Sequence, residues 1–256
     1  MRKILLTFVA SLLVTLSGAG LTLAQDGSDV PTLMPIEIDT CSYNNRRDSD
    51  DYDKAMGMMT KWMNDNDSEP YAAIKLNPFY AGEQDFDFVY LGVWLSGADM
   101  GKDMAAWTAS AGDVLEAMDD AVTCAGASMF TSLNIMPLQG DAPDSFVLTV
   151  TDCNVAEGRS TSDAIGALQE YGEYRNATGS PGRMWAWFPT YGNGDEDFDF
   201  KLASSYRDIE AFGNNFQWNQ DNQAYIKRRE LFSGLLDCNV ARSYLAETIV
   251  NTLRDN

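Results

Sequence analysis

The chain carries the same pattern twice, in two copies about 112 residues apart. Two cysteines, one proline, one tryptophan and an Asp-Phe-Asp-Phe motif recur at corresponding positions. They are Cys41, Pro78, 85–88, Trp107 and Cys124 in the first copy, and Cys153, Pro189, 197–200, Trp218 and Cys238 in the second. A period of this length exceeds any solenoid unit, so we expect each copy to fold around a hydrophobic core of its own. We place the two copies at residues 34–136 and 146–250.

Each copy predicts the same order of elements. It opens on an alternating strand, at 35–41 or 146–151, and continues with an amphipathic helix that is N-capped from the polar run at 48–51 or 160–163. A β-hairpin, a helix broken in its middle and a last strand follow. The order β-α-β-β-α-β is the ferredoxin-like arrangement, an antiparallel sheet that carries its helices on one face. The predicted fold class is therefore α+β.

The opposite face of each sheet must also be covered. Residues 184–188, Met-Trp-Ala-Trp-Phe, are apolar on both faces of their strand, as expected where two sheets pack against each other. We therefore predict that the two repeats form one intramolecular α+β barrel. The sequence leaves the oligomeric state open, and a monomer is sufficient for a fold whose repeats pair internally.

The four cysteines test this topology. In the ferredoxin-like order the first and last strands are antiparallel neighbours, so the end of the first strand lies beside the start of the last. Cys41 and Cys124 hold these places in the first copy, and Cys153 and Cys238 hold them in the second. We predict the disulfides Cys41–Cys124 and Cys153–Cys238, which are consistent with an exported protein.

The N-terminus has the layout of a cleavable signal peptide. Met1-Arg2-Lys3 precedes an apolar run at 4–16 and a small-residue region that ends near Ala24. We expect residues 1–24 to be removed and the protein to be periplasmic or secreted. With 38 acidic against 18 basic residues, the surface repels nucleic acid and anionic membranes, and no later segment is apolar enough for membrane insertion.

The chain contains no histidine. This removes the commonest metal ligand and the commonest general base near neutral pH. Ser-His-Asp and Cys-His catalysis are excluded, as are sites in which histidine holds zinc or haem. The acidic runs at 48–53 and 65–69 lack the glycine and the final glutamate of a twelve-residue calcium loop. We therefore expect no metal and no cofactor.

Two ferredoxin-like units in tandem, each with a split second helix and an aromatic hairpin, resemble the dimeric α+β barrel superfamily in a fused, single-chain form. The Cys-x-Tyr block at 41–43 and the Phe-Asp-Phe block at 86–88 also make the chain similar to exported marine-bacterial proteins with such blocks. The superfamily includes cofactor-independent monooxygenases, haem-degrading enzymes, chlorite dismutases, peroxidases and lactone isomerases, so the resemblance implies no single activity. Its haem enzymes typically depend on histidine, which argues against a haem function here.

Asp87 and Asp199 are the candidate catalytic residues. Each lies between two phenylalanines, so its side chain points to the face opposite those rings. Burial would raise the pKa of such a carboxyl and let it act as a base, and Arg47 and Arg159 are natural partners for it. The structural alternative is an aspartate that caps the hairpin turn or pairs with an arginine. The enzyme hypothesis requires these two aspartates to be buried.

Aromatic side chains are the candidates for a ligand pocket. The set that could line a cleft between sheet and helices, where this fold usually accommodates ligands, is Trp94, Trp185, Trp187 and Tyr206, with Arg47 and Arg159 as polar partners. The structural alternative is that these rings belong to the hydrophobic core.

The leading functional hypothesis is binding of a small apolar or aromatic molecule in this cleft, without catalysis. An alternative is a cofactor-independent monooxygenase or isomerase that uses Asp87 or Asp199. A further alternative is an envelope module that binds other proteins through its outer faces. Catalysis predicts a carboxyl of strongly raised pKa inside a cavity, whereas the interaction module predicts an exposed apolar patch.

Overall fold

The computed structural model describes residues 33–136, 143–192 and 196–253, and these residues belong to one compact unit. The predicted signal peptide at 1–24 lies outside the described residues. Within the described ranges, no helix combines the length and the apolar character needed to cross a membrane.

The order of elements follows the sequence repeat. The first half contains β1 (Leu33–Tyr43), α1 (Ser49–Asp65), β2 (Tyr71–Tyr80), β3 (Phe88–Trp94), α2 (Gly97–Ser110), α3 (Gly112–Ala121) and β4 (Val122–Met136). The second half contains β5 (Ser145–Val155), α4 (Thr161–Ala177), β6 (Gly182–Tyr191), β7 (Phe200–Tyr206), α5 (Ile209–Asp221), α6 (Ala224–Phe232), β8 (Leu236–Cys238) and β9 (Arg242–Asn251). The predicted break in the second helix is present in both halves.

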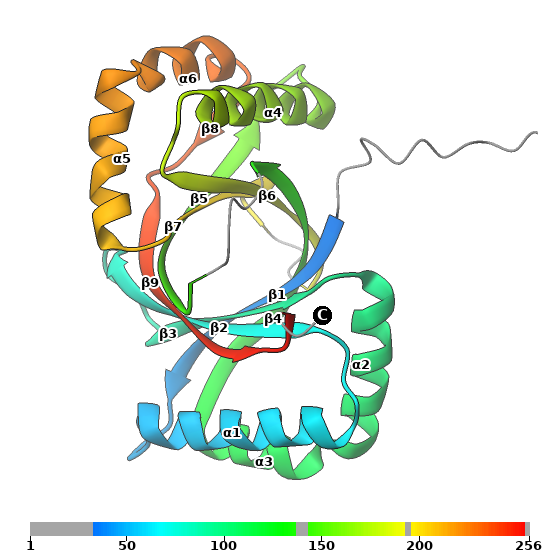
Figure 1. Ribbon diagram of the computed structural model, residues 1–256. Helices are drawn as coiled ribbons and strands as arrows, with labels where there is room; N and C mark the ends of the chain where they lie inside the picture. Colours follow the sequence, from blue (N-terminus) through cyan, green and yellow to red (C-terminus); the bar gives the residue numbers. More distant parts are fainter. Residues whose placement is uncertain (1–32, 137–142, 193–195, 254–256) are drawn as a thin grey trace, which may run out of the picture. The chain divides into compact units, whose positions relative to one another are not determined.

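Eight strands close into a barrel in the order β7-β6-β4-β1-β3-β2-β9-β5, and β5 pairs back onto β7. Every strand pair is antiparallel, and the short strand β8 lies beside β5 as a ninth member. The two halves are joined twice, by β4 with β6 and by β2 with β9. Their sheets are therefore hydrogen-bonded edge to edge into one closed wall (Figure 1), which is the predicted α+β barrel in a more continuous form than two stacked sheets.

The helices cover the outside of this wall. α1, α2 and α3 cover the first half together with part of β9, and α4, α5 and α6 cover the second half together with part of β4 (Figure 1). Side chains alternate along each strand, so Ile36 and Ile38 of β1 point into the barrel while Cys41 packs under the helices. Both faces of the barrel wall are thereby buried, one by the barrel interior and one by helices.

Both predicted disulfides are confirmed. Cys41 is bonded to Cys124, its direct partner in the β1–β4 register. Cys153 is bonded to Cys238, its partner in the β5–β8 register. The last strand of the second half is divided into β8 and β9, and the disulfide ties the separated piece to β5.

Candidate functional site

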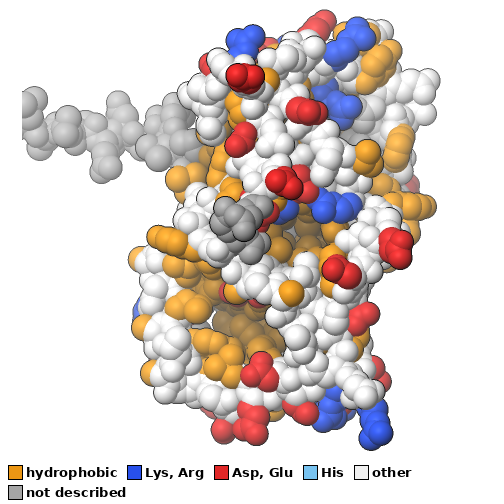
Figure 2. All heavy atoms as spheres, turned by 180° about the vertical axis from the view of Figure 1, so that it is seen from behind, with side chains coloured by type: hydrophobic (Ala, Val, Ile, Leu, Met, Phe, Trp, Pro, Cys, Tyr) orange, Lys and Arg blue, Asp and Glu red, His pale blue; other side chains and the backbone are white. Residues whose placement is uncertain are grey.

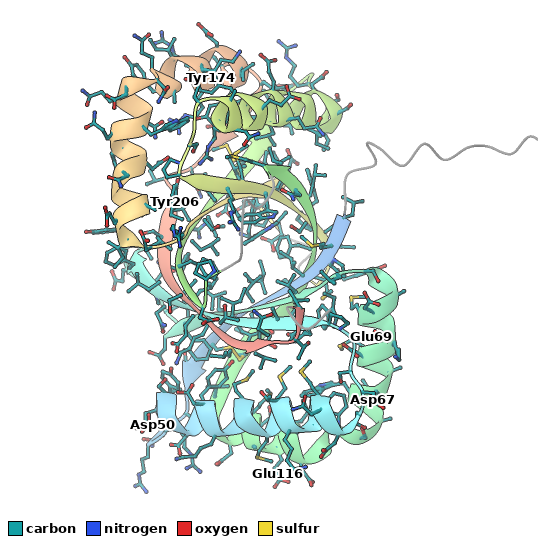
Figure 3. All side chains as sticks on the ribbon, in the orientation of Figure 1. Asp50, Asp67, Glu69, Glu116, Tyr174 and Tyr206 are labelled. Carbon is teal, nitrogen blue, oxygen red and sulfur yellow. A yellow bond between two sulfur atoms is a disulfide. The ribbon has the colours of Figure 1, made fainter. Side chains whose placement is uncertain are left out.

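The aromatic residues predicted to form one cleft lie in three places. Trp185 and Trp187 line a cavity inside the barrel, whereas Trp94 lines a pocket between the first-half strands and their helices. Tyr206 lies in the barrel wall on the side of α5 (Figure 3), where its ring packs 5.5 Å from that of Phe212. The structure thus offers two cavities, and they share no lining residue.

The barrel cavity has a volume of about 660 Å³, and all eight barrel strands contribute to its wall. The remainder of the barrel interior is filled by a hydrophobic cluster that includes Leu76, Phe130 and Tyr244. Figure 2 shows two hollows floored by hydrophobic side chains on the face turned away from Figure 1, one at the level of the barrel and one below it. Both Lys or Arg and Asp or Glu side chains lie beside the upper hollow.

The second cavity, which we call the helix-side pocket, has a volume of about 320 Å³. Its walls are mostly aromatic and sulfur-containing side chains from β2, β3 and α1 to α3: Tyr52, Met59, Trp62, Met63, Tyr71, Tyr90, Trp94, Met104, Trp107 and Met118. Two acidic side chains of β1, Glu37 and Asp39, also line it. This combination of apolar walls and a few convergent polar groups is typical of a small-molecule site.

Glu37 lies at the centre of a hydrogen-bonded group. The Tyr71 hydroxyl donates to Glu37 Oε1 at 2.7 Å, and the Tyr71 and Tyr90 hydroxyls are hydrogen-bonded to each other. Burial raises the pKa of Glu37 to about 7, because the pocket disfavours the charged carboxylate more than the hydrogen bond from Tyr71 favours it. The negative charge of Asp39 raises this pKa further.

Glycine at position 92 makes this arrangement possible. Gly92 of β3 is the direct register partner of Glu37. A Cβ atom at position 92 would lie 2.2 Å from the Tyr71 hydroxyl and 2.5 Å from Glu37 Oε1. A glycine inside a strand often marks a place where another group approaches the backbone closely, and here the carboxyl and the phenol occupy that space.

Asp39 is the second titratable group of the pocket. Burial raises the pKa of its carboxyl to about 6. Its Oδ1 atom is buried and has no hydrogen-bond partner among the described residues. An acceptor of this kind beside Glu37 is available to a hydrogen-bond donor on a bound molecule.

Asp103 of α2 fixes one wall of the pocket. Its carboxylate accepts hydrogen bonds from the Glu69 backbone N–H at 2.9 Å and from Trp94 Nε1 at 3.2 Å. The Trp94 ring in turn packs 4.6 Å from that of Tyr71. The predicted pocket residue Trp94 therefore has a defined orientation, because its polar end is bonded to a buried acid.

The structure corrects the expectations for Asp87 and Asp199. Both are exposed. Asp87 Oδ2 accepts from the Tyr43 backbone N–H at 2.8 Å, and Asp199 Oδ2 accepts from the Val155 backbone N–H at 2.7 Å. Neither lines a cavity described above. Their exposure removes the premise of the catalytic hypothesis, and the same backbone contact in both halves accounts for the repeat of the motif.

The two arginines expected beside these aspartates are elsewhere. Arg47 is exposed and forms ion pairs with Asp120 and, at 3.9 Å, with Asp51. Arg159 is also exposed. Neither arginine lines the barrel cavity or the helix-side pocket, so the expected Asp–Arg site is not assembled.

Sequence reasoning missed Glu37 and Asp39. They occupy the polar positions of an alternating strand, which is the pattern of a strand with one face in water. Helices cover that face here, so the polar positions face a pocket. One available signal was the loss of symmetry, because the second copy has Thr149 and Thr151 where the first has the two acids.

The fold is that of the dimeric α+β barrel proteins. It resembles a proposed monooxygenase from Lactobacillus acidophilus NCFM, with a TM-score of 0.54, 12% identity and coverage of 86% of this chain and 95% of that chain. It also resembles a proposed monooxygenase from Fusobacterium nucleatum, with a TM-score of 0.54, 10% identity and coverage of 88% of this chain and 96% of that chain. A proposed chlorite dismutase is similar as well, with a TM-score of 0.52, 11% identity and coverage of 85% of this chain and 96% of that chain. Identities this low show the fold alone.

Neither a protein-family model nor a curated protein matches the chain. The resemblance to exported marine-bacterial proteins therefore stays a prediction.

The residues of the helix-side pocket do not fit haem. The chain has no histidine to ligate the iron. The described lining residues include four acids, Glu37, Asp39, Asp103 and Asp119, and no Lys or Arg. Such a lining repels the carboxylates that haem carries, so we derive no chemistry through that cofactor.

Proposed function

We propose that the protein binds a small apolar or aromatic molecule in the helix-side pocket and removes a proton from it with Glu37. The observation that carries this proposal is a carboxyl whose pKa is raised to about 7 and which lies in an aromatic pocket beside a tyrosine hydroxyl. A general base is most effective when its pKa lies near the working pH. Glu37 meets this condition, whereas Asp87 and Asp199 do not line the pocket.

The proposed step is a proton transfer. A C–H or O–H bond of the bound molecule breaks, its proton passes to the Glu37 carboxylate, and the electron pair stays on the molecule as a carbanion or phenolate. Tyr71 holds the carboxyl in place through its hydrogen bond. The aromatic and methionine walls exclude water from the reacting group, which strengthens electrostatic interactions in the pocket. Isomerases and cofactor-independent monooxygenases both require such a step.

Hydrogen–deuterium exchange tests the step without assuming the complete reaction. Aromatic ketones and phenols with exchangeable C–H groups would be incubated with the protein in D2O and followed by NMR. We expect catalysed exchange whose rate rises with pH through about 7, as Glu37 loses its proton. The Glu37→Gln variant should lose this exchange, while Glu116→Gln, which changes an exposed acid of α3, should retain it.

Two results would decide against catalysis. Saturable binding without exchange would leave the pocket as a binding site only, which is the non-catalytic form of the hypothesis. If the exchange rate were equal in wild type and in Glu37→Gln, Glu37 would not be the group that accepts the proton.

We infer further that the chain consists of two fused ferredoxin-like units and is exported. The repeated order of elements and the matched disulfides support the first inference. The disulfides and the N-terminal sequence support the second, because disulfides persist in oxidising compartments such as the periplasm and the extracellular space. Mass spectrometry of the exported fraction would test it, and a mature chain that begins near Gln25 is the expected result.

A further inference from the structure

The barrel cavity has its own chemistry, which the proposed proton transfer does not use. Its volume of about 660 Å³ lies within the range of small-molecule sites, roughly 300 to 1,000 Å³. Most of its wall is apolar, with Ile36, Leu91, Phe146, Trp185 and Trp187 among the lining side chains. A molecule that fills this space therefore needs an apolar body.

The charge of the cavity is opposite to that of the whole chain. The chain carries 38 acidic against 18 basic residues, a net charge of −20. The described residues that line the cavity nevertheless include two arginines, Arg183 and Arg207, and no Asp or Glu. A lining with arginines and without acids favours an anion over a cation, although Arg207 is also paired with Asp208 outside the lining.

Arg183 is placed to meet a ligand that lies inside the barrel. It belongs to β6, and the alternation of that strand puts it on the same face as Trp185 and Trp187. Burial and the positive charge of Arg207 both lower the pKa of Arg183. Arg207 is exposed and forms an ion pair with Asp208 at 3.8 Å, so the head group of a ligand inside the barrel would meet mainly Arg183. A carboxylate suits the planar fork of an arginine side chain, which has five donors.

A polar atom within the cavity wall also points to a ligand. The side-chain oxygen of Asn134, a lining residue from β4, is buried without a hydrogen-bond partner among the described residues. Buried polar atoms in proteins are nearly always hydrogen-bonded, to protein, water or ligand. This acceptor is therefore free for a donor on a bound molecule or for a bridging water.

We propose that the barrel cavity is a second binding site, for an amphipathic carboxylate. The apolar body of the ligand lies against Trp185, Trp187 and Phe146, and its carboxylate lies beside Arg183. This cavity is distinct from the helix-side pocket, because the two have no lining residue in common.

Calorimetric titration of the full chain at pH 8 with three probes of equal chain length tests the proposal: decanoate, 1-decanol and decyltrimethylammonium. We expect decanoate to bind at least roughly tenfold more tightly than either of the others, a difference of about 1.4 kcal/mol. Non-specific attraction by a chain of net charge −20 would instead favour the cation. Binding of the cation or the alcohol with equal affinity would overturn the proposal.

Variants locate the binding site. Arg183→Gln should weaken the binding of decanoate by roughly tenfold or more and leave the binding of decanol unchanged, because only the carboxylate head group loses its partner. Arg159→Gln, a change at an exposed arginine outside the cavity, is the matched control and should bind like wild type. Val93→Phe, which adds volume to the cavity wall, should abolish binding of decanoate.

The same titration separates this site from the proposed catalytic pocket. Glu37→Gln should bind decanoate like wild type. Loss of decanoate binding in Glu37→Gln, or its retention in a folded Val93→Phe variant, would show that the ligand lies outside the barrel.

Discussion

At the scale of single residues, the helix-side pocket depends on the space that Gly92 leaves free. Glu37 and Tyr71 come from neighbouring parts of the wall and meet above the backbone of Gly92. A burial that raises the pKa of a carboxyl is a cost to the folded state whenever that carboxyl is charged. The pocket therefore retains a destabilising group, which is common at functional sites.

Gly92→Ala should disrupt this group. The new methyl would lie 2.2 Å from the Tyr71 hydroxyl and 2.7 Å from Glu37 Cγ, so both side chains must move. We expect a loss of about 1 to 3 kcal/mol in the free energy of unfolding, as for other overpacked sites, together with loss of the Glu37-dependent exchange. Urea denaturation and the exchange assay measure the two effects.

Gly57→Ala is the matched control, because a methyl at this position in α1 meets nothing within 4 Å. It should stabilise the protein by about 0.5 to 1 kcal/mol through helix propensity. A Gly92→Ala protein as stable and as active as wild type would contradict the described packing of Glu37 and Tyr71.

Glu37→Gln should change how stability depends on pH. The pKa of Glu37 is about 7 in the folded protein against a usual value of 4.5, so the folded state binds the proton more tightly than the unfolded state. This contribution is fully present below pH 4.5 and is lost as the pH rises through 7. The variant escapes that loss, so relative to wild type it should gain up to about 3 kcal/mol between pH 4.5 and pH 8.

Urea denaturation of both proteins at a series of pH values measures this difference. Glu116→Gln provides the comparison at an exposed position and should run parallel to wild type. If the unfolding free energy of Glu37→Gln changed with pH in the same way as that of the wild type, the Glu37 carboxyl would have an ordinary pKa.

At the scale of elements, the sequence predicted the scaffold better than the site. Two copies constrain each other, so the strand order, the split helix and both disulfides follow from features that are present twice. The same criterion misled the choice of catalytic residues. Asp87 and Asp199 recur because each accepts the backbone N–H two residues after a disulfide cysteine, which is a structural role.

The pocket acids lie where the halves differ. At the positions that correspond to Glu37 and Asp39, the second copy has Thr149 and Thr151. At the position that corresponds to Gly92 it has Ser204. An alternating strand cannot by itself distinguish water from a pocket under helices on its polar side. The placement of α1 to α3 over β1 was needed to show that these acids line a pocket and are only partly exposed.

Removal of the first-half disulfide tests the contribution of a cross-link between β1 and β4. The bond closes a separation of 83 residues, for which the chain-entropy argument gives about 4 to 5 kcal/mol of stabilisation. The variant with Cys41→Ser and Cys124→Ser should lose stability of this order, measured by urea denaturation. The corresponding change at Cys153 and Cys238, with a separation of 85 residues, should cost nearly the same.

A much smaller loss at Cys153 and Cys238 would indicate that β8 contributes little to the barrel. β8 pairs only with the end of β5, through three residue pairs, whereas Cys124 lies inside the long strand β4. The loss of unfolding free energy on reduction of the wild-type protein should equal the sum of the losses in the two double variants.

At the scale of the whole molecule, the closed barrel couples the halves. The cluster with Phe88 lies under the first-half helices and also contains Val250 of β9, while the cluster with Phe200 lies under the second-half helices and also contains Leu133 and Ile135 of β4. A third cluster, inside the barrel, contains residues from both halves. The strand pairs β4–β6 and β2–β9 cross between the halves, so neither half can unfold without exposing sheet edges and barrel core of the other.

We therefore expect a single cooperative unfolding transition, in which a substitution that destabilises one half lowers the stability of the other half equally. With Trp185, Trp187 and Trp218 replaced by Phe, the remaining tryptophans all report on the first half. In that background, Cys153→Ser with Cys238→Ser should shift the urea midpoint of the first-half fluorescence as much as that of the circular dichroism. The reason is that the second-half strands β6 and β9 are structural neighbours of the first-half strands β4 and β2. A fluorescence midpoint that stays in place while the circular dichroism shifts would mean that the halves unfold separately, and the barrel would then be two domains in contact.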